Sequence, residues 1–253
     1  MFVNICVYVC KCLCVCLYIM NNYLEPNLHN DINILKQYFD KQNTHLITSS
    51  HAFENDCNNY IKNIIKKIRC SENLIKYLLS FNGVDSNYRL MYVCEMNELY
   101  SSRMRGLGSD AGSDAVFQEN HIDGPFGFIP FLTLIRCIVT IYNETEIKTN
   151  IKGKNIACKM GEFIGHDYNR DLHFIYGEQL ETQKRYVLKL HYILYPEWMP
   201  FLLVVCFKYL NTKYNSIARK LFLYTINPKT YGQKVCTFFV NFFTVIYAKG
   251  FNN

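Results

Sequence analysis

The chain has 253 residues, of which 50% are hydrophobic and 19% are charged. This apolar content is enough to bury a core and excludes a mainly disordered chain, and the length fits one or two domains. No repeat with a period of roughly 20–50 residues is present, which excludes solenoids and propellers. The twelve cysteines form no CxxC pair. Isolated cysteines in apolar sequence behave as small core residues, which favours an intracellular, reducing compartment over a secreted disulfide scaffold.

Residues 1–20 form a hydrophobic, cysteine-rich segment, in which only Asn4 and Lys11 are not apolar. Its length just suits a membrane span, although Lys11 at mid-span would be costly. The segment lacks the basic n-region and small-residue cleavage site of a signal peptide, and its cysteine spacing matches no metal knuckle. We interpret it as a hydrophobic anchor or as a spurious extension before a start at Met20.

The next region, 21–84, is predicted to be helical. Between Asp31 and Ser80 the apolar residues recur with the 3.6-residue period of amphipathic helices, and lysines occupy the other side of the second run. Gly83 ends that run. We interpret these helices as packing elements.

From 85 to 197 the pattern changes to short apolar runs rich in β-branched and aromatic residues. The runs cover 88–96, 134–142, 161–168, 172–176 and 185–195. Strands at such close intervals favour a sandwich or a barrel. The stretch 104–130 between the first two runs is rich in Gly, Ser and Asp, and a loop of that length in a compact domain is usually functional. The fold class predicted is mainly β with flanking helices.

His121 and Asp123 close this loop and are the first candidate site residues. Residues two apart in an extended segment point to the same side, so these two would present an imidazole and a carboxylate together. His173 lies in a later strand. Two histidines and one carboxylate on one face of a metal leave the other face open, which is the facial triad of non-haem Fe(II) oxygenases. Asp171, two residues before His173, is a candidate to orient its imidazole.

The strand predicted at 185–195 alternates, with Arg185, Val187, Lys189 and His191 on one face. Cationic residues on such a face are typical of the lining of a polar barrel rather than of an apolar core. Arg185 at its start could pair with the far carboxylate of a dicarboxylic co-substrate. Lys189 is the alternative for that role. His166 and His191 are alternatives to His173, and Arg136 faces either the co-substrate or solvent.

The order of these residues resembles that of the Fe(II)/2-oxoglutarate-dependent dioxygenases. The segment GEFIGHDYNRDLHFIYGEQLETQKRYVLKLHYILYP (161–196) is similar to the end of the aspartyl/asparaginyl β-hydroxylase-like group. The resemblance covers about 85–197 and implies a double-stranded β-helix, or jelly-roll. It implies that His121, Asp123 and His173 bind iron and that Arg185 holds 2-oxoglutarate. The β-hydroxylase prototype has Gly in place of Asp123, so its substrate does not carry over.

The cofactors implied by the resemblance are Fe(II), 2-oxoglutarate and O2, and it admits ascorbate as an additional cofactor. The function it implies is hydroxylation of an unidentified substrate, either a protein side chain or a lipid or small molecule. Two rivals stay open. One is a non-catalytic, membrane-associated jelly-roll binding or structural protein. The other is a cupin-type metal enzyme that does not use 2-oxoglutarate.

The C-terminal tail, 198–253, carries the positive charge of the chain. The net charge is +6, yet no acidic residue follows Glu197, while seven Lys and Arg do. Apolar runs beside these cations suit either a helix on an anionic membrane surface or a helical cap packed on the barrel. The basic residues are spread out and form no nucleic-acid motif, so we expect no nucleic-acid partner.

Overall fold

The structure, a computed structural model, describes residues 22–42, 49–81, 87–102, 121–143, 147–176, 185–225, 229–236 and 238. The hydrophobic segment 1–20 and most of the long loop, 104–120, lie outside the described residues. Among the described residues, no helix is long and apolar enough to cross a membrane.

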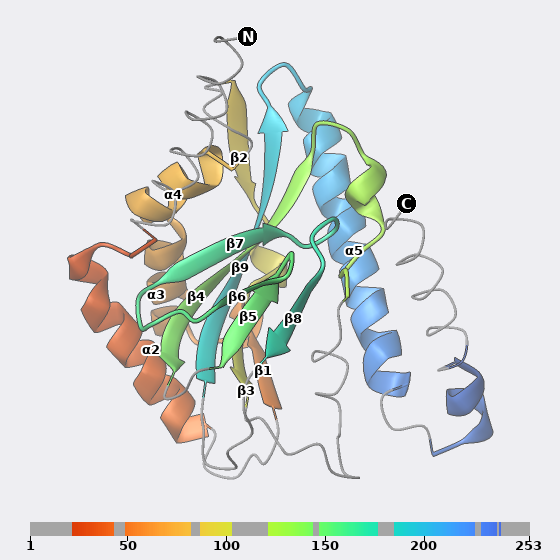
Figure 1. The fold of residues 1–253 in the computed structure, drawn as a ribbon, viewed down its shortest axis with the longest axis horizontal. Helices are drawn as coiled ribbons and strands as arrows, with labels where there is room; N and C mark the ends of the chain where they lie inside the picture. Colours follow the sequence, from red (N-terminus) through yellow and green to blue (C-terminus); the bar gives the residue numbers. More distant parts are fainter. Residues whose placement is uncertain are drawn as a thin grey trace, which may run out of the picture.

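The N-terminal region supplies helices that cover one face of a large sheet. They are α2 (His29–Gln42), α3 (Asn59–Arg69) and α4 (Glu72–Leu79), with the short 3-10 turns Pro26–Leu28 and Glu54–Asp56. Asn58 and Ser71 cap α3 and α4, because their side chains accept hydrogen bonds from the backbone N–H groups three residues on. The apolar stripes of these helices are buried in one core with the sheet. Figure 1 shows the three helices to the left of the sheet.

This sheet has six antiparallel strands. They are β1 (Ser49–Phe53), β2 (Tyr88–Tyr92), β3 (Glu98–Ser102), β4 (Thr133–Asn143), β7 (Phe163–Asp167) and β9 (Arg185–Pro196). The order is β1-β3-β9-β4-β7, and β2 pairs with the far end of β9. Strand β1 is a difference from the prediction, since it lies within the region predicted to be helical. Its pairing with β3, far along the chain, stabilises an extended form that the local pattern does not indicate.

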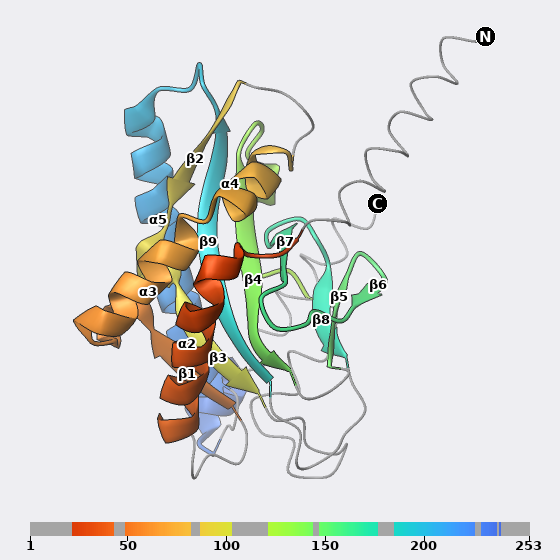
Figure 2. The ribbon, with the colours of Figure 1, turned by 90° about the vertical axis from the view of Figure 1, so that its left-hand side faces the viewer.

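A second, smaller sheet faces the inner side of the first. It contains β6 (Lys154–Ile156), β5 (Lys148–Ile151) and β8 (His173–Tyr176), in that order. From β4 to β9 the chain alternates between the two sheets, which is the winding of a double-stranded β-helix (Figure 2). The predicted fold class, a β core with flanking helices, is confirmed. The sequence did not indicate β3, β5 and β6 as separate strands because they are short and carry polar residues.

Strand β9 is the centre of the fold, and all twelve of its residues are buried. Tyr186, Leu188, Leu190 and Tyr192 face the helices and belong to the largest core. The other face, which includes Arg185 and Lys189, points between the sheets. The predicted alternation of this strand is therefore confirmed, and it turns charged side chains into the barrel.

Helix α5 (Phe201–Thr225) follows β9 and lies on the opposite side of the large sheet from α2, α3 and α4 (Figure 1). Its residue Val204 is buried with Ile193 and Tyr195 of β9 and with Tyr168, which follows β7. A helix in the C-terminal tail was predicted and is present.

Candidate metal centre

His121, Asp123 and His173 meet at the edge of the small sheet. His121 and His173 exchange two backbone hydrogen bonds of 3.2 and 3.1 Å, so His121 extends the sheet beside β8. The Asp123 N–H donates to the carbonyl of Tyr168 at 2.8 Å. Main-chain hydrogen bonds thereby hold together residues that are 52 positions apart (His121 and His173) and 45 positions apart (Asp123 and Tyr168) in the chain.

The loop after Asp123 is fastened to the turn that precedes β8. Gly127 lies so close to this turn that a Cβ there would stand 2.5 Å from the backbone oxygen of Asn169, so only glycine fits. The Phe126 N–H donates to Asn169 Oδ1 at 3.0 Å, and the Arg170 guanidinium donates to the Gly127 carbonyl at 2.8 Å. The sequence HIDGPFG is thus locked to the turn that leads into His173.

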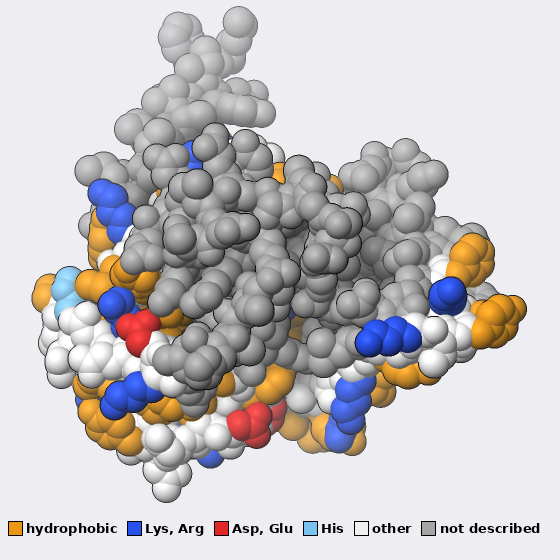
Figure 3. Space-filling view, turned by 90° about the horizontal axis from the view of Figure 1, so that it is seen from below, with side chains coloured by type: hydrophobic (Ala, Val, Ile, Leu, Met, Phe, Trp, Pro, Cys, Tyr) orange, Lys and Arg blue, Asp and Glu red, His pale blue; other side chains and the backbone are white. Residues whose placement is uncertain are grey.

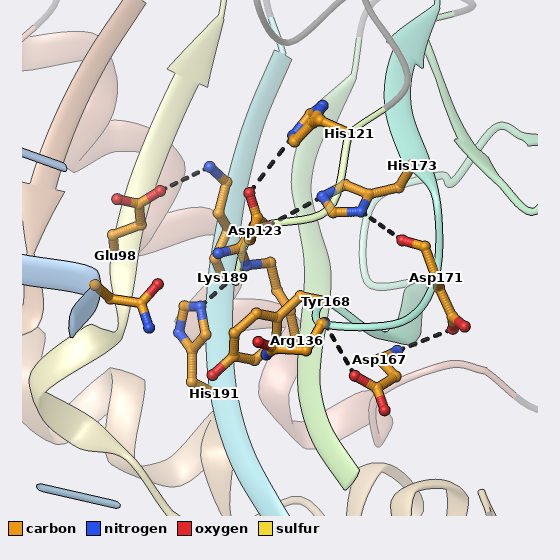
Figure 4. Close-up of polar contacts among 12 residues, drawn as sticks. Glu98, His121, Asp123, Arg136, Asp167, Tyr168, Asp171, His173, Lys189 and His191 are labelled. Atoms are coloured by element: carbon orange, nitrogen blue, oxygen red, sulfur yellow. Dashed lines mark hydrogen bonds and ion pairs between the residues drawn. The ribbon is translucent and has the colours of Figure 1, made fainter. Parts of the chain in front are cut away.

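The side chains of the three residues have the spacing of ligands of one metal ion. His173 Nε2 lies 3.1 Å from Asp123 Oδ2, and His121 Nε2 lies 3.5 Å from Asp123 Oδ1 (Figure 4). One ligand atom from each residue lies within 4.8 Å of the others. Two ligands at right angles, each about 2.1 Å from an ion, are about 3 Å apart. The donor set and its spacing therefore fit an octahedral ion that keeps an open face.

The tautomer of His173 suits metal binding. Its Nδ1 lies 2.9 Å from the backbone oxygen of Asp171, which can only accept, so Nδ1 carries a proton and Nε2, now 3.1 Å from Asp123 Oδ2, is the nitrogen that would bind a metal ion. Asp171 therefore orients His173 through its carbonyl group. Its carboxylate instead accepts from the Asp167 N–H at 3.0 Å and pairs with Lys152 at 2.8 Å.

Asp123 is held in its ionised form. Burial alone would raise the pKa of its carboxyl group, but Arg136 first, then His173 and His121, hold that pKa well below its usual range. Arg136 is in direct contact with Asp123 Oδ2 and also donates from Nε to His191 Nε2 at 3.0 Å. Arg136 therefore points inward, toward the triad carboxylate.

Neither alternative histidine belongs to the cluster of ligand atoms, although His166 lies next to it. His191 Nε2 is occupied by Arg136. The His166 ring lies 4.4 Å from the His173 ring, and neither of its nitrogens has a hydrogen-bond partner among the described residues. Burial, reinforced by nearby positive charge, lowers the pKa of both histidines well below the usual value, so both are neutral.

A pocket of about 420 Å³, including its open mouth, adjoins the triad and lies between the sheets. The lining includes His121, His166 and His173, and three cations: Arg136, Arg185 and Lys189. Among the described residues, no Asp or Glu lines it, which suits an anionic ligand.

Of these cations, Arg185 is the one without a carboxylate partner among the described residues. Lys189 pairs with Glu98 at 2.7 Å, and Arg136 pairs with Asp123. Arg185 is only 3% exposed; its Nη2 donates to Thr149 Oγ1 at 2.7 Å, and its Nε has no partner. Burial lowers the pKa of this guanidinium. An unpaired buried charge is costly, so its retention beside the triad points to an anion.

Three residues near the site were not indicated by the sequence. Thr149 supports Arg185 from the short strand β5. The ring of Tyr168 lies under the Arg136 guanidinium, with 5.1 Å between the ring centroid and Arg136 Cζ. The side-chain amide of Asn211, in α5, donates a hydrogen bond of 2.7 Å to the Tyr168 hydroxyl. No local pattern marks these residues, because each reaches the site through an element distant in sequence.

No protein-family model and no curated protein sequence matches the chain. Some solved structures resemble it at low similarity. A non-heme monooxygenase, ThoJ in complex with nickel, is 12% identical over 70% of this chain and 74% of that chain, with a TM-score of 0.41. The non-heme alpha ketoglutarate dependent epimerase SnoN from nogalamycin biosynthesis is 10% identical, with coverages of 73% and 85% and a TM-score of 0.46.

A structure of prolyl 4-hydroxylases from Phytophthora capsici is 12% identical, covers 89% of this chain and 78% of that chain, and has a TM-score of 0.41. Likenesses at this level assign no reaction to the chain, and the reactions named for these three proteins differ from one another. The function is therefore argued from the site.

Proposed function

We propose that the chain is an Fe(II)- and 2-oxoglutarate-dependent oxygenase. In the proposed reaction, one oxygen atom of O2 enters a substrate C–H bond as hydroxyl and the other enters succinate, while 2-oxoglutarate loses CO2. One observation carries the proposal. His121, Asp123 and His173 converge beside a pocket in which the guanidinium of Arg185 is buried without a carboxylate partner among the described residues.

The triad would hold the metal. His121 and His173 offer Nε2, and Asp123 offers an oxygen of a carboxylate that is already ionised. When bound, Fe(II) supplies open coordination positions for a chelating acid and for O2. The carbonyl of Asp171 keeps the His173 lone pair directed at the ion.

Arg185 would bind the distal carboxylate of 2-oxoglutarate. Its guanidinium is held in place by Thr149, its Nε is still available, and it lines the same pocket as His121 and His173. A guanidinium and a carboxylate form paired, charge-assisted hydrogen bonds, which are strongest where water is excluded. Neutral His166, with two unpartnered nitrogens, would contribute a hydrogen bond to the bound acid.

The substrate class follows less directly. The resemblance of 161–196 to the aspartyl/asparaginyl β-hydroxylase-like group supports a hydroxylase, but Asp123 stands where that prototype has Gly. We therefore propose hydroxylation without choosing between a protein side chain and a lipid or small molecule. We also propose an intracellular, reducing location, which is supported by the seven described cysteines, all of which are free.

The test is metal content and 2-oxoglutarate turnover of the purified full chain. We expect one Fe(II) per chain and formation of succinate even without substrate. His173→Ala should remove both, whereas His29→Ala, at an exposed histidine of α2, should change neither. Arg185→Met should keep the metal but form succinate only at much higher concentrations of 2-oxoglutarate.

Other outcomes would identify the rivals. If the protein binds metal but does not consume 2-oxoglutarate, and if Arg185→Met does not change the metal content, the chain is a cupin-type enzyme. Absence of both metal and succinate would indicate a non-catalytic jelly-roll. Retained turnover in His173→Ala would reject His173 as a ligand.

A further inference from the structure

Helix α5 exposes an apolar face instead of burying it. Val204 and Asn211 are buried against the domain, while the solvent side carries large hydrophobic side chains. We define the apolar face of α5 by the six residues Phe201, Leu202, Tyr209, Leu210, Ile217 and Leu221. Leu202 is 74% exposed and Phe201 is 66% exposed. Trp198 and Phe131, whose rings meet edge to face at 5.4 Å, add exposed aromatic surface just before the helix.

The charged residues of α5 and of the chain after it are all basic. Lys213 and Lys220 lie among the apolar residues of α5, and Lys229 and Lys234 follow. No Asp or Glu occurs after Glu197. Figure 3 shows hydrophobic side chains next to Lys and Arg at the right-hand edge of the molecule, the side on which Figure 1 places the C-terminal part of the chain.

The helix is firmly joined to the domain, so the domain would follow wherever this face docks. Asn211 donates to the Tyr168 hydroxyl at 2.7 Å, and Lys208 pairs with Glu95 at 3.2 Å. Tyr214 packs edge to face on Phe126, which lies in the loop that carries Asp123; the two ring centroids are 5.4 Å apart. The helix, and with it the apolar face on its solvent side, is thus fixed to the domain.

We propose that the apolar face of α5 docks on an anionic lipid bilayer. Helices with exposed apolar side chains and flanking lysines lie in the interface, with aliphatic groups among the acyl chains and ammonium groups among the headgroups. Tyr and Trp favour the headgroup level, and Tyr209 of α5 and Trp198 just before the helix are both exposed. A second copy of the chain on this face would bring lysines against lysines, which is unfavourable, whereas anionic headgroups complement them. The proposal is independent of the metal site.

The test is sedimentation of the full chain with vesicles of phosphatidylcholine containing about 30% phosphatidylserine, and with phosphatidylcholine alone. We expect binding to the anionic vesicles only, and loss of most binding at about 1 M salt, where the Debye length is about 3 Å. Leu202→Glu with Leu210→Glu should weaken binding at least roughly tenfold, since two apolar anchors become charged. Lys213→Ala should weaken it about fivefold.

Tyr60→Glu is the matched control, because Tyr60 is equally exposed but lies on α3; it should bind like the wild type. All of these positions are exposed, and circular dichroism checks that each variant is folded. The proposal is overturned if the full chain does not bind the anionic vesicles. It is also overturned if the double variant binds them as well as the wild type does, because another segment would then be responsible for binding. It is also overturned if the double variant instead abolishes dimers or removes an acidic protein partner.

Discussion

Arg136 and Asp123 form an ion pair at the centre of the candidate site, with their side chains only 15% and 17% exposed. The carboxylate that would bind a metal thus already has a cation beside it. A metal ion bound at the proposed site would share this carboxylate with Arg136, and the balance between the two cations can be measured.

Removal of the Arg136 charge should make the fold depend on metal. In Arg136→Met, Asp123 loses its main partner, and the metal-free protein should lose about 3–5 kcal/mol in free energy of unfolding. Zn(II) or Fe(II) should restore most of this loss, since the ion replaces the cation and binds only the folded state. Thermal melts with and without chelator measure this. Arg89→Met, at an exposed pair with Glu197, is the control. Equal stabilisation of both variants by metal would contradict the prediction.

The buried histidines should make the metal-free fold sensitive to acid. The pKa of His166 lies well below its ordinary value in the folded state, so below about pH 6.5 the unfolded chain binds the proton and the folded chain does not. The contribution of His166 to the free energy of unfolding is therefore fully present above pH 6.5. Below that pH it falls by about 1.4 kcal/mol per pH unit, until the pH reaches the pKa of His166 in the folded protein. His166→Leu should remove this slope at little other cost, because its nitrogens have no partners.

Denaturant titrations at pH 8 and pH 5 check this, with His29→Leu as an exposed control. An unchanged difference between the two pH values in His166→Leu would show that His166 is not the group responsible. His191 should contribute in the same direction, because its pKa is also lowered.

Arg185 should serve binding at the expense of stability. Arg185→Met removes a buried charge that has no carboxylate partner among the described residues, so the unliganded protein should be as stable as the wild type or more so. The KM for 2-oxoglutarate should rise at least roughly 30-fold, since truncation of one partner of a buried charge pair costs about 2–5 kcal/mol. Steady-state turnover and thermal melts measure the two effects. A loss of stability without a change in KM would contradict the role.

The Asn211–Tyr168 contact should couple α5 to the site. Asn211→Leu leaves a buried Tyr168 hydroxyl without its donor and should cost about 1–3 kcal/mol in unfolding free energy. Tyr168→Phe leaves the Asn211 amide unsatisfied instead, and the double variant should cost less than the sum of the two single variants. Additive effects in this double-mutant cycle would show that the contact contributes nothing.

The sequence by itself indicated the main strands and the side of β9 that each residue faces. Strand alternation is a local property with a period of two, so placing Arg185 and Lys189 on one face and Leu188 on the other needs no tertiary information. The H-x-D spacing likewise put His121 and Asp123 on one side of the chain. Helix α5 was foreseen within the tail, but β1 was not, because pairing with β3 overrides its local pattern.

Only the tertiary structure decided which of these side chains meet. The pairing of Arg136 with Asp123, of Lys189 with Glu98 and of Arg185 with Thr149 depends on strand register and on closure of the second sheet over the first. Those contacts left Arg185, rather than Lys189, as the pocket cation without a carboxylate among the described residues. The packing of Val204 and Asn211 on the domain turned the apolar side of α5 outward. Local patterns fix where a side chain points from its own strand or helix, whereas its neighbours come from segments that are brought together only when the chain winds between two sheets.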